Sequence, residues 1–375
     1  MNVPKIRFNG FEEEWQENKL CDIARITMGQ SPNSENYTND SNDTLLIQGN
    51  ADLNNGKVIP RLFTKQVTKT CDKNDIIMTV RAPVGDIAIS DYNTCIGRGV
   101  CSIKSSKFVY HYLDYLKMKD YWKKISKGST IDSITSDDIK SLLIKTPNKK
   151  EEEKIIKTID LINKKIELQS KKIEALKLFK KGLIEFEFSN SNYNEINLKE
   201  ILKERKTYSK KGLEFPHVTL SKDGIYDKTD RYYRDFLVKS DDKKYKVTYL
   251  NDLCYNPANL KFGVICLNEY GSAIFSPIYV TFIIKKVANP KYIKYYVTRN
   301  NFINGIRKYE QGTVYERMAV APEDFLKFSI KLPNIEIQNK FVAKLSKLDK
   351  KIELENLKLS KYIKLKKGLM QNMFV

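Results

Sequence analysis

The chain has 375 residues, of which 41% are hydrophobic and 30% charged, enough for two or three domains that each bury a core. No apolar run of about 18 residues and no signal peptide occurs, which argues against a membrane-spanning helix and predicts a soluble, cytoplasmic protein. The formal net charge of +20 favours a polyanionic partner, bound in a salt-dependent way.

The first predicted domain, residues 1–146, is a mixed region with short β-rich runs, such as 75–80 and 86–90. Residues 147–190 change to Lys/Glu-rich, glycine-poor sequence with regularly spaced apolar residues. This pattern predicts a long helix that ends in the polar tract 187–192.

Residues 191–332 return to strand, turn and helix patterns and form the second predicted domain, with 279–285 as a buried strand. Residues 333–375 repeat the helical character of the earlier segment. The predicted order is therefore mixed domain, long helix, mixed domain, long helix.

Residues 137–188 and 323–374 are similar without a gap, 186 positions apart. The mixed domains are related more weakly, with 75–85 matching 253–263 at an offset of 178. A duplicated chain tends to fold into two like halves related by a pseudo-two-fold axis. Duplex DNA is the first partner to consider for such symmetry.

Apolar residues in both helical segments recur at alternating steps of four and three, which is the spacing of a coiled-coil seam. Polar residues interrupt both seams at the same places, Gln169 and Glu355, then Lys180 and Lys366. We expect the two helices to pack on each other, although each could instead pack on its own domain. The seam residues are Ile155, Ile159, Ile162, Ile166, Ile173, Leu176, Leu183, Phe341, Leu345, Leu348, Ile352, Leu359, Tyr362 and Leu369.

Four local motifs, together with the duplicated helix, resemble the specificity subunit of type I restriction-modification systems over the whole length of the chain. The motifs are residues 78–86 with 96–100; 252–258 with Gly263 and 276–280; 128–130 ahead of 144–147; and the Lys-Lys-Gly-Leu ending of both helices. Each motif is modest alone, and their combination is specific.

The resemblance implies an α+β fold. Two mixed α/β target recognition domains, related by pseudo-two-fold symmetry, would be separated by two long helices that form an antiparallel coiled coil. It also implies a non-catalytic protein. Each domain would read one half of a split double-stranded DNA sequence, and the helices would dock two methyltransferase subunits. Motor-nuclease subunits would join them, and the partner subunits would bring S-adenosylmethionine, ATP and magnesium, none of which this chain would bind.

The expected dimensions agree with this function. Two readers on one face of a duplex must lie about one helical turn apart, roughly 34–36 Å. Helices of about 35 residues are roughly 50 Å long, a suitable length for a spacer.

Enzymatic motifs are weak or missing in the sequence. Asn256-Pro257-Ala258-Asn259 departs from the Asn/Asp-Pro-Pro-aromatic motif of amine methyltransferases, and we interpret it as a turn. No P-loop occurs, and six scattered cysteines with two histidines, His111 and His217, provide no zinc-binding cluster. We therefore expect no catalytic residue and no metal site.

Loop arginines, amides and hydroxyls in the mixed domains are the candidate DNA contacts. Arginine can donate two hydrogen bonds to guanine, and Asn or Gln can pair in the same way with adenine. The candidates of the first domain are Gln30, Ser31, Gln48, Asn50, Arg61, Arg81, Arg98, Lys127, Ser129 and Thr130. Those of the second domain are Lys222, Arg231, Arg234, Asn256, Asn259, Lys261, Arg307, Tyr315 and Arg317.

Two alternatives remain open at this point. A self-sufficient DNA-modifying enzyme would form product without partners when given metal and methyl donor. A nonspecific nucleic-acid-binding coiled-coil scaffold would bind DNA of any sequence equally.

Overall fold

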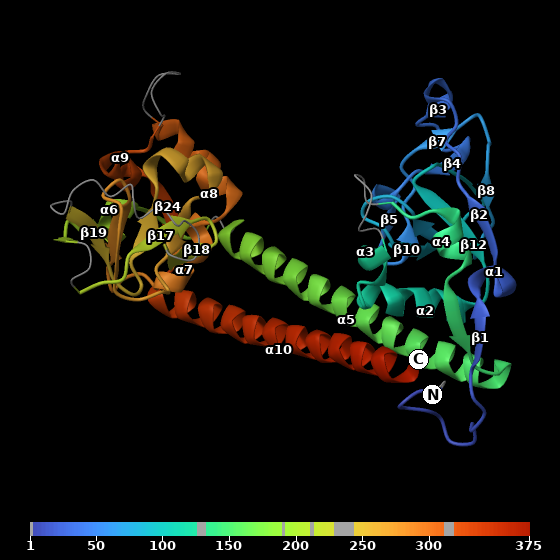
Figure 1. Cartoon of the computed structure of the whole chain (residues 1–375). Coiled ribbons are helices and arrows are strands. Elements are labelled where there is room, and N and C mark those ends of the chain that lie inside the picture. The colour runs from blue at the N-terminus through green and yellow to red at the C-terminus, as the bar shows by residue number, and fades with distance from the viewer. Residues whose placement is uncertain (1–2, 126–132, 190–191, 211–213, 229–243, 311–318) are drawn as a thin grey trace. The chain divides into compact units, whose positions relative to one another are not determined.

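The computed structural model describes all residues except 1–2, 126–132, 190–191, 211–213, 229–243 and 311–318 (Figure 1). Their contacts define two compact units. Unit 1 is Met1–Lys171 with Asn356–Val375, and unit 2 is Lys172–Glu355. The long helices α5 (Lys149–Ser189) and α10 (Ile335–Met373) therefore each contribute a segment to both units.

Unit 1 contains a sheet in the order β2-β12-β9-β10-β6-β5, a second sheet in the order β3-β7-β4-β11-β8, and the pair β1-β13. Its strands are β1 (Gln16–Lys19), β2 (Arg25–Met28), β3 (Tyr37–Thr38), β4 (Thr44–Ile47), β5 (Leu53–Asn54), β6 (Lys57–Val58), β7 (Phe63–Thr64), β8 (Thr70–Cys71), β9 (Ile76–Thr79), β10 (Ile87–Ile89), β11 (Thr94–Ile96), β12 (Val100–Lys104) and β13 (Leu143–Thr146). Its short helices are α1 (Leu20–Ile23), η1 (Ser34–Asn36), η2 (Asn50–Asp52), α2 (Lys107–Met118), α3 (Tyr121–Ile125) and α4 (Ser136–Lys140).

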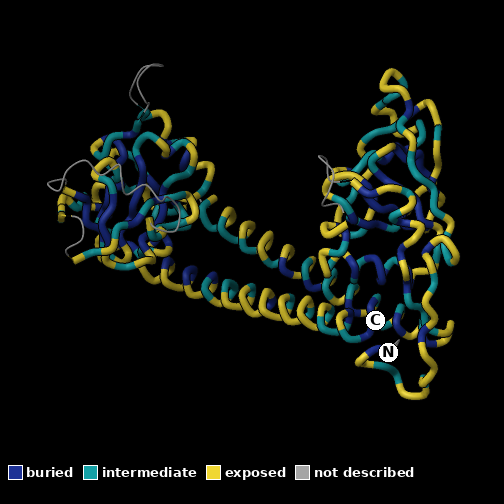
Figure 2. Tube along the Cα trace, in the orientation of Figure 1, coloured by how far each residue is buried: buried dark blue, intermediate teal, exposed yellow. Residues whose placement is uncertain are grey.

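Strand β9 is apolar at successive positions because both of its faces are covered. Ile76 and Met78 belong to one hydrophobic core, and Ile77 belongs to the core on the other side. Successive side chains of a strand point to opposite faces, so an uninterrupted apolar run is what a doubly covered strand requires. Figure 2 shows buried, dark-blue tube inside each unit.

The last residues of the chain complete the larger core of unit 1. Met370, Met373 and Phe374 pack there with Ile155 and Ile159 of α5. The seam spacing did not predict this contact, because these three residues lie beyond the last seam position, Leu369.

Unit 2 contains sheets in the orders β15-β23-β20-β21 and β16-β19-β22, and the pairs β17-β18 and β14-β24. Its strands are β14 (Asn194–Asn197), β15 (Leu202–Glu204), β16 (Tyr208–Lys210), β17 (Val218–Ser221), β18 (Gly224–Asp227), β19 (Lys244–Thr248), β20 (Leu253–Tyr255), β21 (Ile265–Leu267), β22 (Ala273–Phe275), β23 (Val280–Ile284) and β24 (Ser329–Leu332). Its short helices are α6 (Leu198–Ile201), η4 (Pro257–Phe262), α7 (Pro290–Val297), α8 (Asn300–Ile306), η5 (Arg307–Tyr309) and α9 (Pro322–Lys327).

The two units share a core strand order, β2-β12-β9-β10 in unit 1 and β15-β23-β20-β21 in unit 2, which confirms the prediction of two related mixed domains joined to long helices. In unit 1 the pairing of β1 with β13 sets Gln16 opposite Thr146. In unit 2 the pairing of β14 with β24 sets Asn194 opposite Leu332. Strand β20 also repeats the double coverage of β9, with Leu253 and Tyr255 in one core and Cys254 in another.

The helix segments pack on each other inside each unit. In unit 2 they run antiparallel, because Lys172 pairs with Glu355 at 2.8 Å and Lys180 pairs with Asp349 at 2.5 Å. All predicted seam residues are buried or half-buried. Gln169 and Glu355, the polar seam residues, are buried as well. Among the described helices, none is long and apolar enough to span a membrane.

Candidate nucleic-acid interface

Five of the predicted DNA contacts of unit 1 line one polar hollow of about 230 Å³. Its full lining is Ser31, Gln48, Gly49, Asn50, Arg81, Ala82, Arg98 and Gly99. These residues come from the segments that follow β2, β4, β9 and β11. The hollow therefore lies at one end of these strands, where four separate loops meet.

Glycines allow these loops to approach closely. A Cβ on Gly99 would lie 2.0 Å from the carbonyl oxygen of Gln48, and a Cβ on Gly29 would lie 2.1 Å from that of Gly97. Backbone hydrogen bonds then join the loops, with Gly97 N–H donating to Ile47 O at 2.8 Å. Side chains at these glycines would push the loops apart, which explains the Ile96-Gly97-Arg98-Gly99 motif.

The loop that carries Gln48 is held by a buried carboxylate. Asp52 accepts the backbone N–H groups of Gln48 at 2.8 Å and Gly49 at 3.2 Å. Arg61 lies 3.7 Å from Asp52 and donates to the carbonyl oxygen of Ala51 at 3.0 Å. Arg61, a predicted DNA contact, thus also supports the loop of Gln48, while its side chain remains half exposed to solvent.

Two other predicted contacts have partners within the protein. Asn50 donates its amide to Asp86, which also forms an ion pair with Lys117. The hydroxyl of Ser31 accepts the backbone N–H of Arg98 at 3.1 Å. These bonds fix two residues that line the hollow. Gln30 lies next to it, is exposed, and is tied by its backbone N–H to Ile96 O at 2.8 Å.

Arg81 and Arg98 are the chemically available cations of the hollow. Both side chains are exposed, and neither guanidinium has a hydrogen bond or ion pair with another described residue. Each guanidinium carries five N–H donors in a planar arrangement that matches phosphate or the guanine edge. The arrangement can therefore bind an anionic or acceptor-rich ligand, and nothing in it resembles a nucleophile activated by a base.

In unit 2 the loop after β20 carries three predicted contacts. Asn256 is buried, and its side chain accepts the backbone N–H of Ala258 at 3.1 Å, so it caps η4. Asn259 is exposed, and the Lys261 ammonium lies 5.3 Å from the centre of the Phe262 ring. Asn256 thus shapes the loop, whereas Asn259 and Lys261 lie on its surface.

The remaining predicted contacts are dispersed. Lys222 is exposed in the turn between β17 and β18, and Arg307 begins η5 with an ion pair to Glu310 at 3.5 Å. The others lie outside the described residues: Lys127, Ser129, Thr130, Arg231, Arg234, Tyr315 and Arg317.

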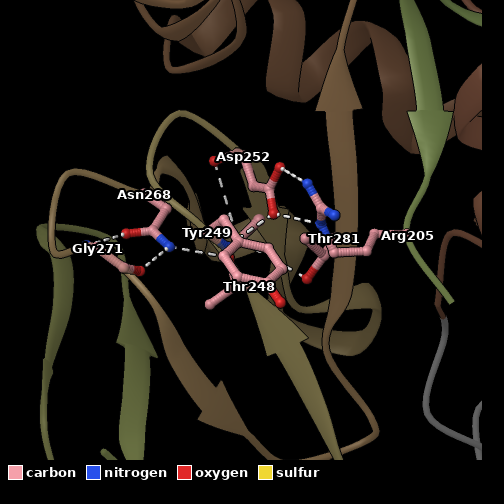
Figure 3. Close-up of polar contacts among 8 residues, drawn as sticks. Arg205, Thr248, Tyr249, Asp252, Asn268, Gly271 and Thr281 are labelled. Carbon is pink, nitrogen blue, oxygen red and sulfur yellow. Dashed lines mark hydrogen bonds and ion pairs between the residues drawn. The ribbon is translucent and has the colours of Figure 1, made fainter. Parts of the chain in front are cut away.

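A buried polar network in unit 2 was not anticipated from the sequence (Figure 3). Arg205 donates to both carboxylate oxygens of Asp252, at 2.7 and 2.9 Å, and lies 4.6 Å over the ring of Tyr249. The hydrogen bond to Asp252 raises the pKa of the Arg205 guanidinium. Nearby, Asn268 donates to Thr248 at 2.9 Å and to Gly271 O at 2.8 Å.

This network braces the opposite end of the sheet from the loop that follows β20. Asp252 precedes β20, and Asn268 follows β21. The signal that could have revealed it is an Asn-Asp pair that occurs in both units. Asn74 and Asn251 have φ of 73° and 68°, and the aspartate after each accepts a backbone N–H three residues earlier.

A second buried polar contact links α2 to α5 in unit 1. His111 is fully buried and lies 3.0 Å from Asp160, measured from Nε2 to Oδ1. Burial lowers the pKa of His111 to about 4, although Asp160 acts in the opposite direction. The imidazole is therefore neutral near pH 7 and donates to the carboxylate.

The outer surfaces of the long helices carry apolar residues at matching positions of the duplicated segment. Leu168 and Leu354 are related by the offset of 186, as are Phe179 and Leu365, and each is more than half exposed. Unit 1 contains Leu168 and Leu365, whereas unit 2 contains Phe179 and Leu354. We call these the outer pairs of the two units.

Comparison with known proteins gives consistent matches. Residues 12–178 match the family model of the type I restriction modification DNA specificity domain. The type I restriction enzyme MjaX specificity subunit of Methanocaldococcus jannaschii is 35% identical over 180 residues, which is 46% of this chain and 42% of that protein. The chain thus aligns with less than half the length of this curated relative.

Solved structures share the fold. A type I restriction-modification system S subunit from M. genitalium matches with a TM-score of 0.57 and 16% identity, covering 100% of this chain and 99% of that one. A chain from a structure of the type I R-M system, solved to explain complex assembly and conformational transition, matches with a TM-score of 0.60 and 14% identity over 97% and 98% of the two chains.

Proposed function

We propose that the chain is the DNA sequence-specificity subunit of a type I restriction-modification complex, and the match of residues 12–178 to the family model of the type I restriction modification DNA specificity domain supports this proposal. It recognises DNA and does not itself catalyse a reaction. Each unit reads one half of a bipartite target, and other chains perform the chemistry.

The observation that carries this proposal is the hollow of unit 1 with two exposed guanidinium groups that pair with no other described residue. Arg98 projects from a loop that close glycine contacts hold against the loop of Gln48, which Asp52 fixes in turn. The loop of Arg81 is closed by Gly85 N–H donating to Thr79 O at 2.9 Å and by the Thr79 hydroxyl donating to Pro83 O at 2.7 Å. A rigid loop with unpaired donors favours recognition of base edges, because donor positions must be fixed before binding to discriminate between bases. The net charge of +20 adds a sequence-independent attraction to phosphates.

The duplicated topology supports a target in two parts. Both units share a core of strand pairings, β2-β12-β9-β10 in unit 1 and β15-β23-β20-β21 in unit 2, yet the loops that would face DNA differ in sequence. Two dissimilar readers on one repeated framework favour an asymmetric split sequence over a palindrome.

The outer pairs of the helices support docking of two methyltransferase subunits, one on each unit. Soluble proteins expose single apolar side chains without consequence, but positions repeated by internal symmetry favour a repeated partner. The methyltransferase subunits would bind S-adenosylmethionine, and motor-nuclease subunits would bind ATP and magnesium.

Reconstitution tests the proposal. The chain is purified alone and with its methyltransferase partner, and each preparation is incubated with methyl donor and a DNA library, after which methylated positions are sequenced. We expect no methylation by the chain alone and, with the partner, methylation confined to one split, asymmetric motif. Methylation by the chain alone, or binding without sequence preference in the complex, would overturn the proposal.

Variants at the hollow sharpen the test. Arg81→Gln and Arg98→Gln should reduce methylation of the motif while the complex still assembles. The matched control is Arg25→Gln, because Arg25 is exposed at the other end of the same sheet, where β2 pairs with the far end of β12. Equal losses for all three variants would indicate nonspecific electrostatics in place of base recognition.

A further inference from the structure

The pseudo-symmetry of the units identifies which loop of unit 2 corresponds to the hollow of unit 1. Before this loop the structural offset is 177, since Asn74-Asp75 and Asn251-Asp252 share the same positive φ and the same backbone hydrogen bond. After the loop the offset is 178, since Gly85 and Gly263 have φ of 84° and 78°. The loop after β20 is therefore one residue longer than the loop after β9.

The second loop of the hollow has an equally clear counterpart. Val100 N–H donates to Gly97 O at 3.2 Å in unit 1, and Tyr279 N–H donates to Ser276 O at 3.0 Å in unit 2. This turn precedes β12 in one unit and β23 in the other, at an offset of 179. Arg98 and Gly99 thus correspond to Pro277 and Ile278.

The chemistry of these corresponding loops is different. In unit 1 they carry Arg81 and Arg98, both exposed and unpaired among the described residues. In unit 2 they carry Phe262, which is 67% exposed, and Ile278, which is 60% exposed. Tyr255 pairs with Val280, so both apolar side chains lie at the same end of the paired strands β20 and β23.

The loop that carries Phe262 is held in place from inside. Leu260 and Ile265, on either side of it, are fully buried, and Asn256 caps the short helix that leads to it. Because the buried side chains of Leu260 and Ile265 hold the backbone on both sides of Phe262, the ring is kept on the surface, and little conformational entropy is lost when it binds a ligand. The Lys261 ammonium beside the ring can reach a phosphate while the ring contacts a base.

Base edges in the major groove match these two chemistries. Guanine presents the N7 and O6 acceptors, which one arginine can bind with two hydrogen bonds. Thymine presents a C5-methyl group, which apolar side chains contact. A guanidinium group therefore fits a guanine, whereas a phenyl ring and an isoleucine fit a thymine methyl.

We propose that the corresponding loops of the two units read different bases: Arg81 and Arg98 supply the guanidinium donors for the edge of a guanine in one half, and Phe262 with Ile278 contacts the methyl group of a thymine in the other. This assignment rests on the DNA-reading function proposed above. It makes the asymmetry of the target a consequence of loop chemistry on a shared framework.

Base analogues test each half separately in the reconstituted methyltransferase complex. Replacing the guanine by 7-deazaguanine removes one acceptor, and the loss of affinity should approach the roughly 5- to 150-fold that a bidentate contact provides. Replacing the thymine by uracil removes only the methyl group and should cost about fourfold.

Variants couple each analogue to its residues. In Arg98→Gln the penalty for 7-deazaguanine should fall, and in Phe262→Ala the penalty for uracil should disappear, while each variant keeps the full penalty in the other half. Arg98→Lys, which keeps the charge but lacks the planar donor arrangement, should resemble Arg98→Gln for guanine recognition. Arg25→Gln should leave both penalties unchanged, and thermal unfolding confirms that each variant is folded.

The outcomes separate this inference from the proposed function. If the complex methylates a split motif, but wild type and variants bind the 7-deazaguanine and uracil analogues with equal affinity losses, the base assignment is wrong. The proposed specificity function would still stand. Loss of the split motif in the wild-type complex itself overturns both.

Discussion

The ring of Phe374 packs against that of Tyr112 in unit 1, with centroids 5.6 Å apart and planes at 85°. Phe374 also contacts Phe108 at 5.4 Å and Tyr115 at 5.4 Å, so it joins α10 to α2 through an aromatic cluster. The end of the second long helix thus stabilises unit 1.

Phe374→Ala should lower the free energy of unfolding of unit 1 by about 3–5 kcal/mol, because it removes a buried ring and leaves a cavity. Denaturant unfolding followed by tyrosine and tryptophan fluorescence measures the change. Phe186→Ala is the matched control, since Phe186 is 79% exposed and should change stability by less than about 0.5 kcal/mol. Equal effects of the two variants would contradict the packing described.

Arg205→Ala should destabilise unit 2 by about 3–5 kcal/mol, because it leaves the buried Asp252 carboxylate without its ionic partner. A double-mutant cycle with Asp252→Asn should show strong coupling between the two positions. Additive effects in the cycle would mean that the pair in Figure 3 contributes no interaction of its own.

The stability of unit 1 should depend on pH through His111. The pKa of His111 is about 4 in the folded chain and about 6.5 when unfolded, so below pH 6.5 the unfolded state binds more protons. The contribution of His111 to the free energy of unfolding is therefore fully present above pH 6.5. About 3 kcal/mol of that free energy is lost as the pH falls towards 4. His111→Gln should remove that part of the slope, which unfolding curves at several pH values can measure; an unchanged slope would argue against a buried neutral imidazole.

Substituting both residues of one outer pair by aspartate should prevent one methyltransferase subunit from binding and leave the binding of the other unchanged. Leu168→Asp with Leu365→Asp changes unit 1, and Phe179→Asp with Leu354→Asp changes unit 2. Native mass spectrometry of the reconstituted complex should show one methyltransferase copy for either variant and two for the wild type. Leu178→Asp serves as control, because Leu178 is exposed but corresponds to Lys364 in the other copy. Two bound copies in every variant would exclude the outer pairs as docking sites.

Periodic parts of the structure could be predicted from the sequence in detail. Every seam position from Ile155 to Leu183 is buried or half-buried, because a heptad repeat specifies which face of a helix is covered. The packing of Met370 and Phe374 at the end of the second helix was not predicted, because these residues contact a globular core whose position depends on distant strands.

The hollow could be predicted only in its components. Ser31, Gln48, Arg81 and Arg98 are recognisable as loop residues with suitable donors, but no local pattern shows that they meet. Their meeting depends on strand pairings that close long loops, such as β4 with β11. Asn256 also matched the expected chemistry, and only the structure shows that its side chain caps η4. Aligning the two mixed domains at a single offset of 178 also concealed the one-residue insertion in the loop after β20. That insertion becomes visible only when equivalent residues are matched by their backbone hydrogen bonds and φ angles.

The most direct test of the account is a chain that carries the first recognition domain twice. Residues 16–146 replace residues 194–332, since β1 with β13 and β14 with β24 share one register and the splice preserves it. If each domain reads one half of the target, methylation mapping of the reconstituted complex should return an inverted repeat of the guanine-containing half with an unchanged gap. A motif that retains the original asymmetric second half would contradict the account.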